Sequence, residues 1–126
     1  MKGRVVALTT AGSDEDAERL ARALVERRLA ACVNVVPRVV SHYRFRGELH
    51  RDEERLLVIK TRAERLAALR AALLELHPYE LPELVALQVS AGHAPYLAWL
   101  DESVATGPRA PARGRPRGRR RPRSRR

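Results

Sequence analysis

The stretch His77-Pro78-Tyr79-Glu80-Leu81-Pro82-Glu83, which we call the proline corner, decides how the second half of the chain folds. A proline fixes its own φ at about −65° and pushes the residue before it into an extended conformation, so His77 and Leu81 are kept out of a helix. Leucine and alanine at helical spacing precede the corner, and the apolar run 84–87 follows it. The pattern therefore predicts a stiff turn from a helix into a strand, with an imidazole, a phenol and two carboxylates held in defined directions.

Outward from the proline corner, the spacing of apolar residues predicts the other elements. Ser13 is a predicted N-cap, with three acids in the first turn of the helix that follows it. Strands are expected over residues 4–10, 31–45, 56–61 and 84–89, and helices over 13–29, 62–76 and 96–104. This order predicts an α+β fold: a ferredoxin-like βαββαβ sandwich with helices on one face of an antiparallel sheet, followed by an extra C-terminal helix.

Two features predict that this unit assembles with copies of itself. The strands around Val5 and Leu57 are apolar on both faces, whereas two helices can cover only one face of a sheet. The hairpin arms are also long, since fifteen extended residues span roughly 50 Å, while a 100-residue domain has a radius of gyration of about 13 Å. The arms must bend at Pro37 or project to pair with a neighbour, so we expect a homo-oligomer.

The net charge of +10 comes from the C-terminal end of the chain. Residues 107–126 contain ten arginines and no acid, which leaves fifteen basic and fifteen acidic side chains in residues 1–106. We therefore expect one domain over 1–106 and a disordered basic tail over 107–126. The tail, with Arg119, Arg120 and Arg121 at its densest point, could bind nucleic acid without sequence preference. The alternative is a solvated extension with no partner.

The cysteine count and the apolar runs of the sequence bear on the cellular compartment of the protein. A single cysteine excludes an intrachain disulfide framework. The N-terminal residues lack the long apolar region of a signal peptide, and no apolar run approaches the roughly 18 residues that suggest a membrane span. We expect a cytoplasmic protein with no membrane partner.

Five blocks of sequence resemble the CutA divalent-cation-tolerance family, in order from about Val5 to Val104: 31–37, 41–47, 57–61, 77–83 and 96–100. The resemblance implies a ferredoxin-like fold assembled as a tight trimer, with sheets packed inward and hairpin arms crossing between subunits. It also implies a role in tolerance to copper and other divalent metals, by binding or scaffolding, and no enzymatic reaction.

The chain departs from this family at three positions. Some bacterial relatives proposed to bind copper have a cysteine where this chain has Thr9, and a second histidine where it has Leu76. Of that proposed Cys-His-His set only His77 is present, which puts that copper site in doubt. Phe45 stands where a tryptophan is more usual and preserves an aromatic side chain.

The candidate metal ligands are His77, Glu80, Glu83 and Cys32. Imidazole with carboxylate suits zinc or copper, and thiolate favours Cu(I). In the competing interpretation His77 caps a helix end, both glutamates pair with arginines and Cys32 is a small buried apolar residue. We favour this second interpretation for Cys32, and both stay open for His77 with Glu80.

Lys60, Tyr79 and Glu80 could instead line a pocket for a small anion or metabolite. Tyr43, Phe45 and Trp99 are expected to be packing anchors at the oligomer interface, and His42, His50 and His93 to face solvent. No phosphate-binding loop or catalytic pair is recognisable. The alternative function is therefore a signalling module that binds a metabolite or nucleotide at subunit clefts, as the similarly folded trimeric PII proteins do.

Overall fold

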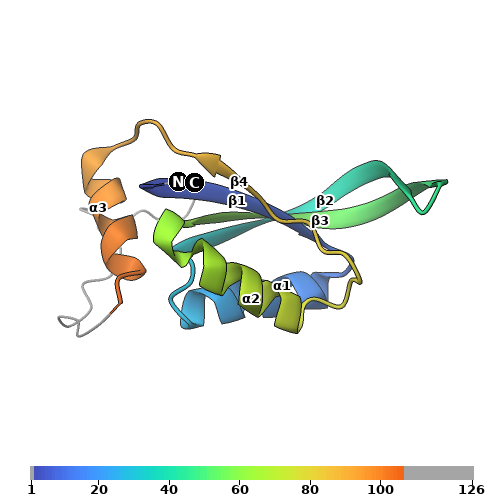
Figure 1. Ribbon diagram of the computed structural model, residues 1–126, viewed down its shortest axis with the longest axis horizontal. Helices are drawn as coiled ribbons and strands as arrows, with labels where there is room; N and C mark the ends of the chain where they lie inside the picture. The colour runs from blue at the N-terminus through green and yellow to red at the C-terminus, as the bar shows by residue number, and fades with distance from the viewer. Residues whose placement is uncertain (1, 107–126) are drawn as a thin grey trace, which may run out of the picture.

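The computed structural model describes residues 2–106, which form one four-stranded sheet with helices packed on it (Figure 1). The elements in chain order are β1 (Arg4–Ala11), α1 (Asp14–Glu26), β2 (Cys32–Phe45), β3 (Glu48–Arg62), the 3₁₀ turn η1 (Ala63–Arg65), α2 (Leu66–Leu76), β4 (Val85–Gln88) and α3 (Ala94–Ser103). This order confirms the predicted βαββαβ core with an extra C-terminal helix. The tail from 107 onward, with Arg119, Arg120 and Arg121, lies outside the described residues.

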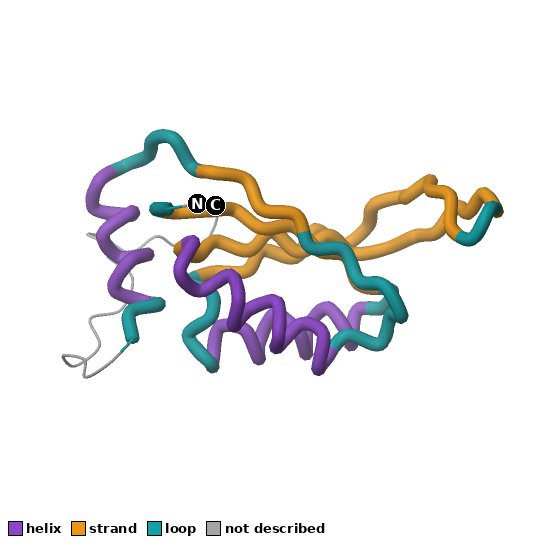
Figure 2. The backbone as a smooth tube through the Cα atoms, viewed as in Figure 1, coloured by secondary structure: helices purple, strands orange, loops and turns teal. Residues whose placement is uncertain are grey.

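The sheet has the strand order β2-β3-β1-β4, and every neighbouring pair is antiparallel. Helices α1 and α2 lie side by side on one face (Figures 1 and 2). The core between them and the sheet contains fully buried Leu20 and Leu24 from α1, Leu57 and Ile59 from β3, and Leu69 from α2. The antiparallel α+β sandwich predicted from the sequence is thereby confirmed.

Helix α1 begins where the sequence predicts it. Ser13 is extended, with φ −146° and ψ 161°, and its Oγ accepts a hydrogen bond from the Asp16 N–H at 3.1 Å. This bond satisfies one of the free N–H groups at the helix N-terminus. The Ser13 cap fixes the start of the helix, and the apolar stripe ending in Leu24 packs it against the core, so local structure and packing both favour this helix.

The hairpin β2–β3 extends past the end of the sheet as a two-stranded arm (Figure 1). Its register shifts between Val36, opposite Leu56, and Val39, opposite Glu54. Pro37 lies in this irregularity, as expected for a residue that cannot donate a ladder hydrogen bond and tends to occur at bulges. The prediction of a strand only over 56–61 was too short, because the polar residues from Glu48 onward also pair with β2.

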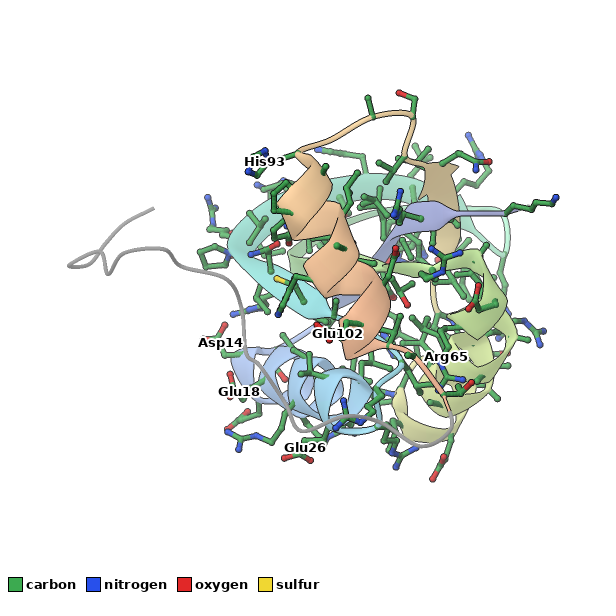
Figure 3. The ribbon with its side chains drawn as sticks, turned by 90° about the vertical axis from the view of Figure 1, so that its left-hand side faces the viewer. Asp14, Glu18, Glu26, Arg65, His93 and Glu102 are labelled. Carbon is green, nitrogen blue, oxygen red and sulfur yellow. The ribbon has the colours of Figure 1, made fainter. Side chains whose placement is uncertain are left out.

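Helix α3 lies across the end of the sheet where β1 begins, as Figure 3 shows in end view. Buried Leu100 and Val104 pack with Ala31, and Tyr96 and Trp99 contact this group. Asp101 accepts hydrogen bonds from Arg4 at 2.6 and 3.0 Å and from Arg62 at 2.8 Å. These ion pairs attach the helix to β1 and β3.

The described residues contain no helix long and apolar enough to cross a membrane.

Candidate functional site

A pocket of about 570 Å³ lies between the hairpin arm, the end of β1 and the proline corner. Its lining combines three phenyl or phenol rings, an imidazole, several hydroxyl groups and four carboxylates, from Thr10, Ser41, His42, Tyr43, Phe45, Asp52, Glu54, Tyr79, Glu80, Leu81 and Glu83. We call this the arm pocket. The bend in β2 and the fixed backbone of the proline corner bring together residues that are distant in sequence.

The proline corner is held against β1 by His77, which is only 7% exposed. Its Nε2 lies 2.7 Å from the Thr10 carbonyl oxygen, and its Nδ1 accepts a hydrogen bond from the Tyr79 N–H at 3.1 Å. A carbonyl oxygen can only accept, so the ring carries its proton on Nε2. The His77 N–H also bonds the Leu73 carbonyl at the end of α2, so His77 is the C-cap of this helix, as one of the two open interpretations expected.

Tyr79 connects the proline corner to the arm. Its hydroxyl donates to Glu54 Oε2 at 2.7 Å, and Glu54 is only 6% exposed. Burial raises the pKa of the Tyr79 phenol, and the hydrogen bond to Glu54 raises it further. A Cβ atom at Gly12 would lie 2.9 Å from the Tyr79 hydroxyl oxygen, so a larger residue at position 12 would require the phenol to shift.

The other carboxylates of the arm pocket are Asp52 from the arm and Glu80 and Glu83 from the proline corner. Asp52 accepts a hydrogen bond from the Tyr43 hydroxyl, which raises the pKa of Tyr43. Loss of water around its carboxylate raises the pKa of Glu83, and the negative charge of Glu54 adds to this increase. Glu80 forms an ion pair with Arg46 at the rim. Neither lysine nor arginine is among the described residues that line the arm pocket, so its lining is strongly acidic.

The structure brings together only part of the predicted metal set. Glu80 and Glu83 line the arm pocket, and His77 lies beside it with both ring nitrogens hydrogen-bonded. Cys32 begins β2, opposite Lys60, at the other end of the strand from Ser41, so the four side chains do not converge. Within residues 2–106 no three histidine, cysteine or acidic side chains are grouped to hold a metal ion.

The predicted pocket of Lys60, Tyr79 and Glu80 is also divided. Tyr79 and Glu80 line the arm pocket, whereas the Lys60 ammonium donates to Asn34 near Cys32. Cys32 is half-buried, with its Sγ 3.7 Å from Asn34 Oδ1. Within one chain Lys60 and Tyr79 therefore do not line the same pocket, because they lie at opposite ends of the sheet.

The predicted aromatic anchors fall into two groups. Tyr43 and Phe45 lie on the arm, where Tyr43 stacks on His50 with ring centroids 5.1 Å apart. Trp99 packs against Tyr96 on α3, with ring centroids 5.4 Å apart. His42 and His93 are exposed, as predicted, whereas His50 is half-buried and its ring stacks on Tyr43.

Asp52 and Glu54 were not among the predicted site residues, although the sequence contains a signal for them. They stand two residues apart in a run of charged residues, and alternate residues of a strand share a face. Once the run is recognised as strand, both carboxylates point to the same side as Tyr43 and toward the proline corner.

Comparison with known proteins decides the family. Residues 5–103 match the model of the family described as CutA1 divalent ion tolerance protein. The chain belongs to this family. It is 48% identical over 99 residues to the divalent-cation tolerance protein CutA of Thermus thermophilus, covering 79% of this chain and 96% of that protein. It is 43% identical over 94 residues to human protein CutA, covering 75% of this chain and 52% of that protein. The chain thus spans nearly all of the bacterial relative and about half the length of the human one.

Solved structures give the same result. The Cut A1 protein of Thermus thermophilus has a TM-score of 0.79 and 46% identity, covering 81% of this chain and 99% of that chain. CutA1 of Oryza sativa has a TM-score of 0.79 and 38% identity, covering 82% and 95%. A CutA from Archaeoglobus fulgidus described as periplasmic has a TM-score of 0.78 and 34% identity, covering 81% and 99%. The expected fold and family are therefore confirmed.

Proposed function

We propose that this protein acts in tolerance to divalent cations as a homotrimeric binding or scaffolding protein of the cytoplasm, without catalysing a reaction. The observation that carries this proposal is the family match over residues 5–103, because relatives with this fold are named divalent-cation tolerance proteins. The arm pocket supports it as well, since its carboxylates attract cations.

The trimer is supported by the sheet face that carries no helices. The register places seven apolar side chains on that face, namely Val6, Leu8, Val36, Leu56, Val58, Val85 and Leu87, and we call this set the open face. Val85 and Leu87 are 48% and 53% exposed in the single chain. A continuous apolar surface of this kind favours burial against other copies. The long outer edge of β2 offers a further surface for strand pairing.

For the metal, Glu80 and Glu83 are the most accessible of the four predicted ligands, because both are exposed at the arm pocket. His77 would have to give up a hydrogen bond to Thr10 or Tyr79 before it could bind copper or zinc. We therefore assign metal binding to the carboxylates and assign to His77 the role of positioning the proline corner. Cys32 is too distant to complete this set.

Titration calorimetry of the full chain with Cu²⁺ and with Zn²⁺, beside light scattering, tests this function. We expect saturable binding at an integral number per trimer that is weakened at least tenfold in Glu83→Gln. Glu75→Gln is the matched control, since Glu75 lies on α2 and pairs with Arg27. A clean trimer without saturable binding would remove the direct metal role and leave scaffolding.

The alternative of a PII-like nucleotide module has less support. The arm pocket is large enough for a small metabolite, but its carboxylates repel phosphate groups. Thermal unfolding with and without nucleotides decides the matter: a rise in Tm with a nucleotide, absent with Cu²⁺ and Zn²⁺, would favour the module.

The basic tail supports a separate interaction with nucleic acid. Its ten arginines favour phosphate contacts whose affinity falls as salt rises. Binding of a mixed-sequence RNA to the full chain should therefore weaken steeply with salt, and it should be lost when residues 107–126 are removed. Binding that persists in the shortened chain would assign it to the body.

A further inference from the structure

The charge of Glu54 is not balanced within the described chain. Glu54 is only 6% exposed, and the hydrogen bond that it accepts comes from the neutral Tyr79 hydroxyl. None of the ion pairs within residues 2–106 includes it. A carboxylate removed from water is costly unless an opposite charge or several hydrogen bonds accompany it. Its setting therefore favours a positive charge in the adjoining pocket.

The surroundings of Glu54 strengthen this preference. Asp52 and Glu83 line the same pocket, and the hydrogen bond that Asp52 accepts comes from the neutral Tyr43 hydroxyl. The pKa of Glu83 is raised in part by Glu54, which indicates that the two carboxylates repel one another across the pocket. A cation between them would relieve this repulsion.

The shape and lining of the arm pocket select the kind of cation. A metal ion held by protein ligands alone requires several donors at coordination distance, and residues 2–106 contain no such group of three, so a metal ion at Glu80 and Glu83 would need further ligands from water or another subunit. The pocket of about 570 Å³ is instead walled by the rings of Tyr43, Phe45 and Tyr79. Aromatic faces beside carboxylates recognise alkylammonium and guanidinium groups through cation–π attraction and charge-assisted hydrogen bonds.

We propose that the arm pocket is a binding site for an organic cation, an alkylguanidinium or alkylammonium group, held by Glu54 and Glu83 against the rings of Tyr43 and Tyr79. This site goes beyond the proposed function, since it needs no metal ion. The same chemistry has two sources: a free amine or guanidine, and an arginine or lysine side chain of a second copy of this chain.

The test compares two probes of nearly the same shape, one charged and one neutral. Titration calorimetry of the full chain with n-butylguanidinium should give saturable binding at one site per chain, whereas neutral N-butylurea should give none. Glu54→Gln keeps an oxygen for the Tyr79 hydroxyl and removes the charge, so it should weaken binding at least tenfold. Glu83→Gln should weaken it as well, and Glu75→Gln on α2 should leave it unchanged.

Light scattering of the same variants distinguishes the two sources. If a second copy supplies the cation, n-butylguanidinium will not bind the assembled protein, and Glu54→Gln and Glu83→Gln will lower the oligomer mass while Glu75→Gln does not. Because Glu83 is exposed, Glu83→Gln keeps the test valid even if Glu54→Gln fails to fold. The proposal is overturned if n-butylguanidinium does not bind and Glu83→Gln leaves the oligomer mass unchanged. It is also overturned if N-butylurea binds equally strongly. Binding of Cu²⁺ or Zn²⁺ is a separate result and decides only the metal role.

Discussion

At the scale of single residues, the proline corner is held in place by His77, whose main role is structural. His77 connects three parts of the chain: the Leu73 carbonyl through its N–H, the Thr10 carbonyl through Nε2 and the Tyr79 N–H through Nδ1. If a buried carbonyl or N–H loses its hydrogen-bond partner, the fold is destabilised, because the group has lost its water and gains no bond in return. The histidine therefore fixes the direction in which the corner presents Tyr79 and Glu80.

The first prediction concerns this histidine. His77→Ala should lower the free energy of unfolding by about 1–3 kcal/mol, because it leaves buried polar groups unpaired and opens a small cavity. Urea denaturation of the full chain measures this change. His93→Ala is the control, since His93 is exposed and makes no cap hydrogen bond with its side chain. An equal effect of the two substitutions would mean that the His77 ring contributes little to the fold.

The second prediction concerns the contact between Gly12 and Tyr79. Gly12→Ala should destabilise the fold by about 1–3 kcal/mol, because the new Cβ would lie 2.9 Å from the phenol oxygen. Tyr79→Phe removes that oxygen, so Gly12→Ala should cost less in the Tyr79→Phe background. A double-mutant cycle by urea denaturation measures the coupling. Strictly additive effects would show that the clash is absorbed elsewhere.

The sequence predicted the corner itself but not the residues opposite it. Prolines act through local geometry, so Pro78 and Pro82 can be interpreted without a structure. The importance of Glu54 depends on the register of β2 with β3, which the bulge near Pro37 shifts. That register is a long-range property, and the polar run 51–55 gives no apolar alternation from which to infer it.

At the scale of elements, the boundaries of the helices and strands depend to different degrees on local capping and on tertiary packing or pairing. Helix α1 has both a cap and an apolar stripe, so its start was predictable to the residue. Helix α2 begins with a 3₁₀ turn and has no side-chain cap hydrogen bond, so its predicted start at 62 was too early. Strand β3 was predicted too short because its first half is stabilised by pairing with β2 and not by burial.

The third prediction concerns how α3 is attached. The hydrogen bond from Arg4, supported by Arg62, lowers the pKa of Asp101 below its ordinary value. A carboxylate with a lowered pKa in the folded state adds stability above its unfolded pKa, and this stability is lost as the pH falls through the folded pKa. The packing of α3 should therefore weaken in acid, starting below about pH 4.

Asp101→Asn tests this attachment. The variant should be less stable than the natural chain at neutral pH, and its stability should fall less on acidification. Urea denaturation at about pH 7 and about pH 3, followed by Trp99 fluorescence on α3, measures both effects. Glu26→Gln, at the exposed end of α1, should keep the full acid dependence. Parallel pH profiles for Asp101→Asn and the natural chain would show that other carboxylates cause the acid loss.

At the scale of the whole molecule, the two faces of the sheet require different partners. The face under α1 and α2 is closed, with Leu57 and Ile59 fully buried. The open face is an apolar surface across all four strands, and it continues toward the arm pocket at Thr10. The sequence predicted that such a surface exists, because the strands are apolar on both sides. It could not place the pocket at its margin, since that position depends on the bend of the arm.

The last prediction follows from this difference between the faces. Leu87→Glu places a charge within the open face, where assembly would bury it without a partner, so it should lower the mass of the oligomer measured by light scattering. Leu74→Glu is the matched control, since Leu74 on α2 is 50% exposed against 53% for Leu87 and lies on the helical side of the sheet. The control should keep the mass of the natural chain. If Leu87→Glu keeps that mass while Leu74→Glu loses it, the subunits associate through their helices, and the assembly has the opposite orientation to the one proposed.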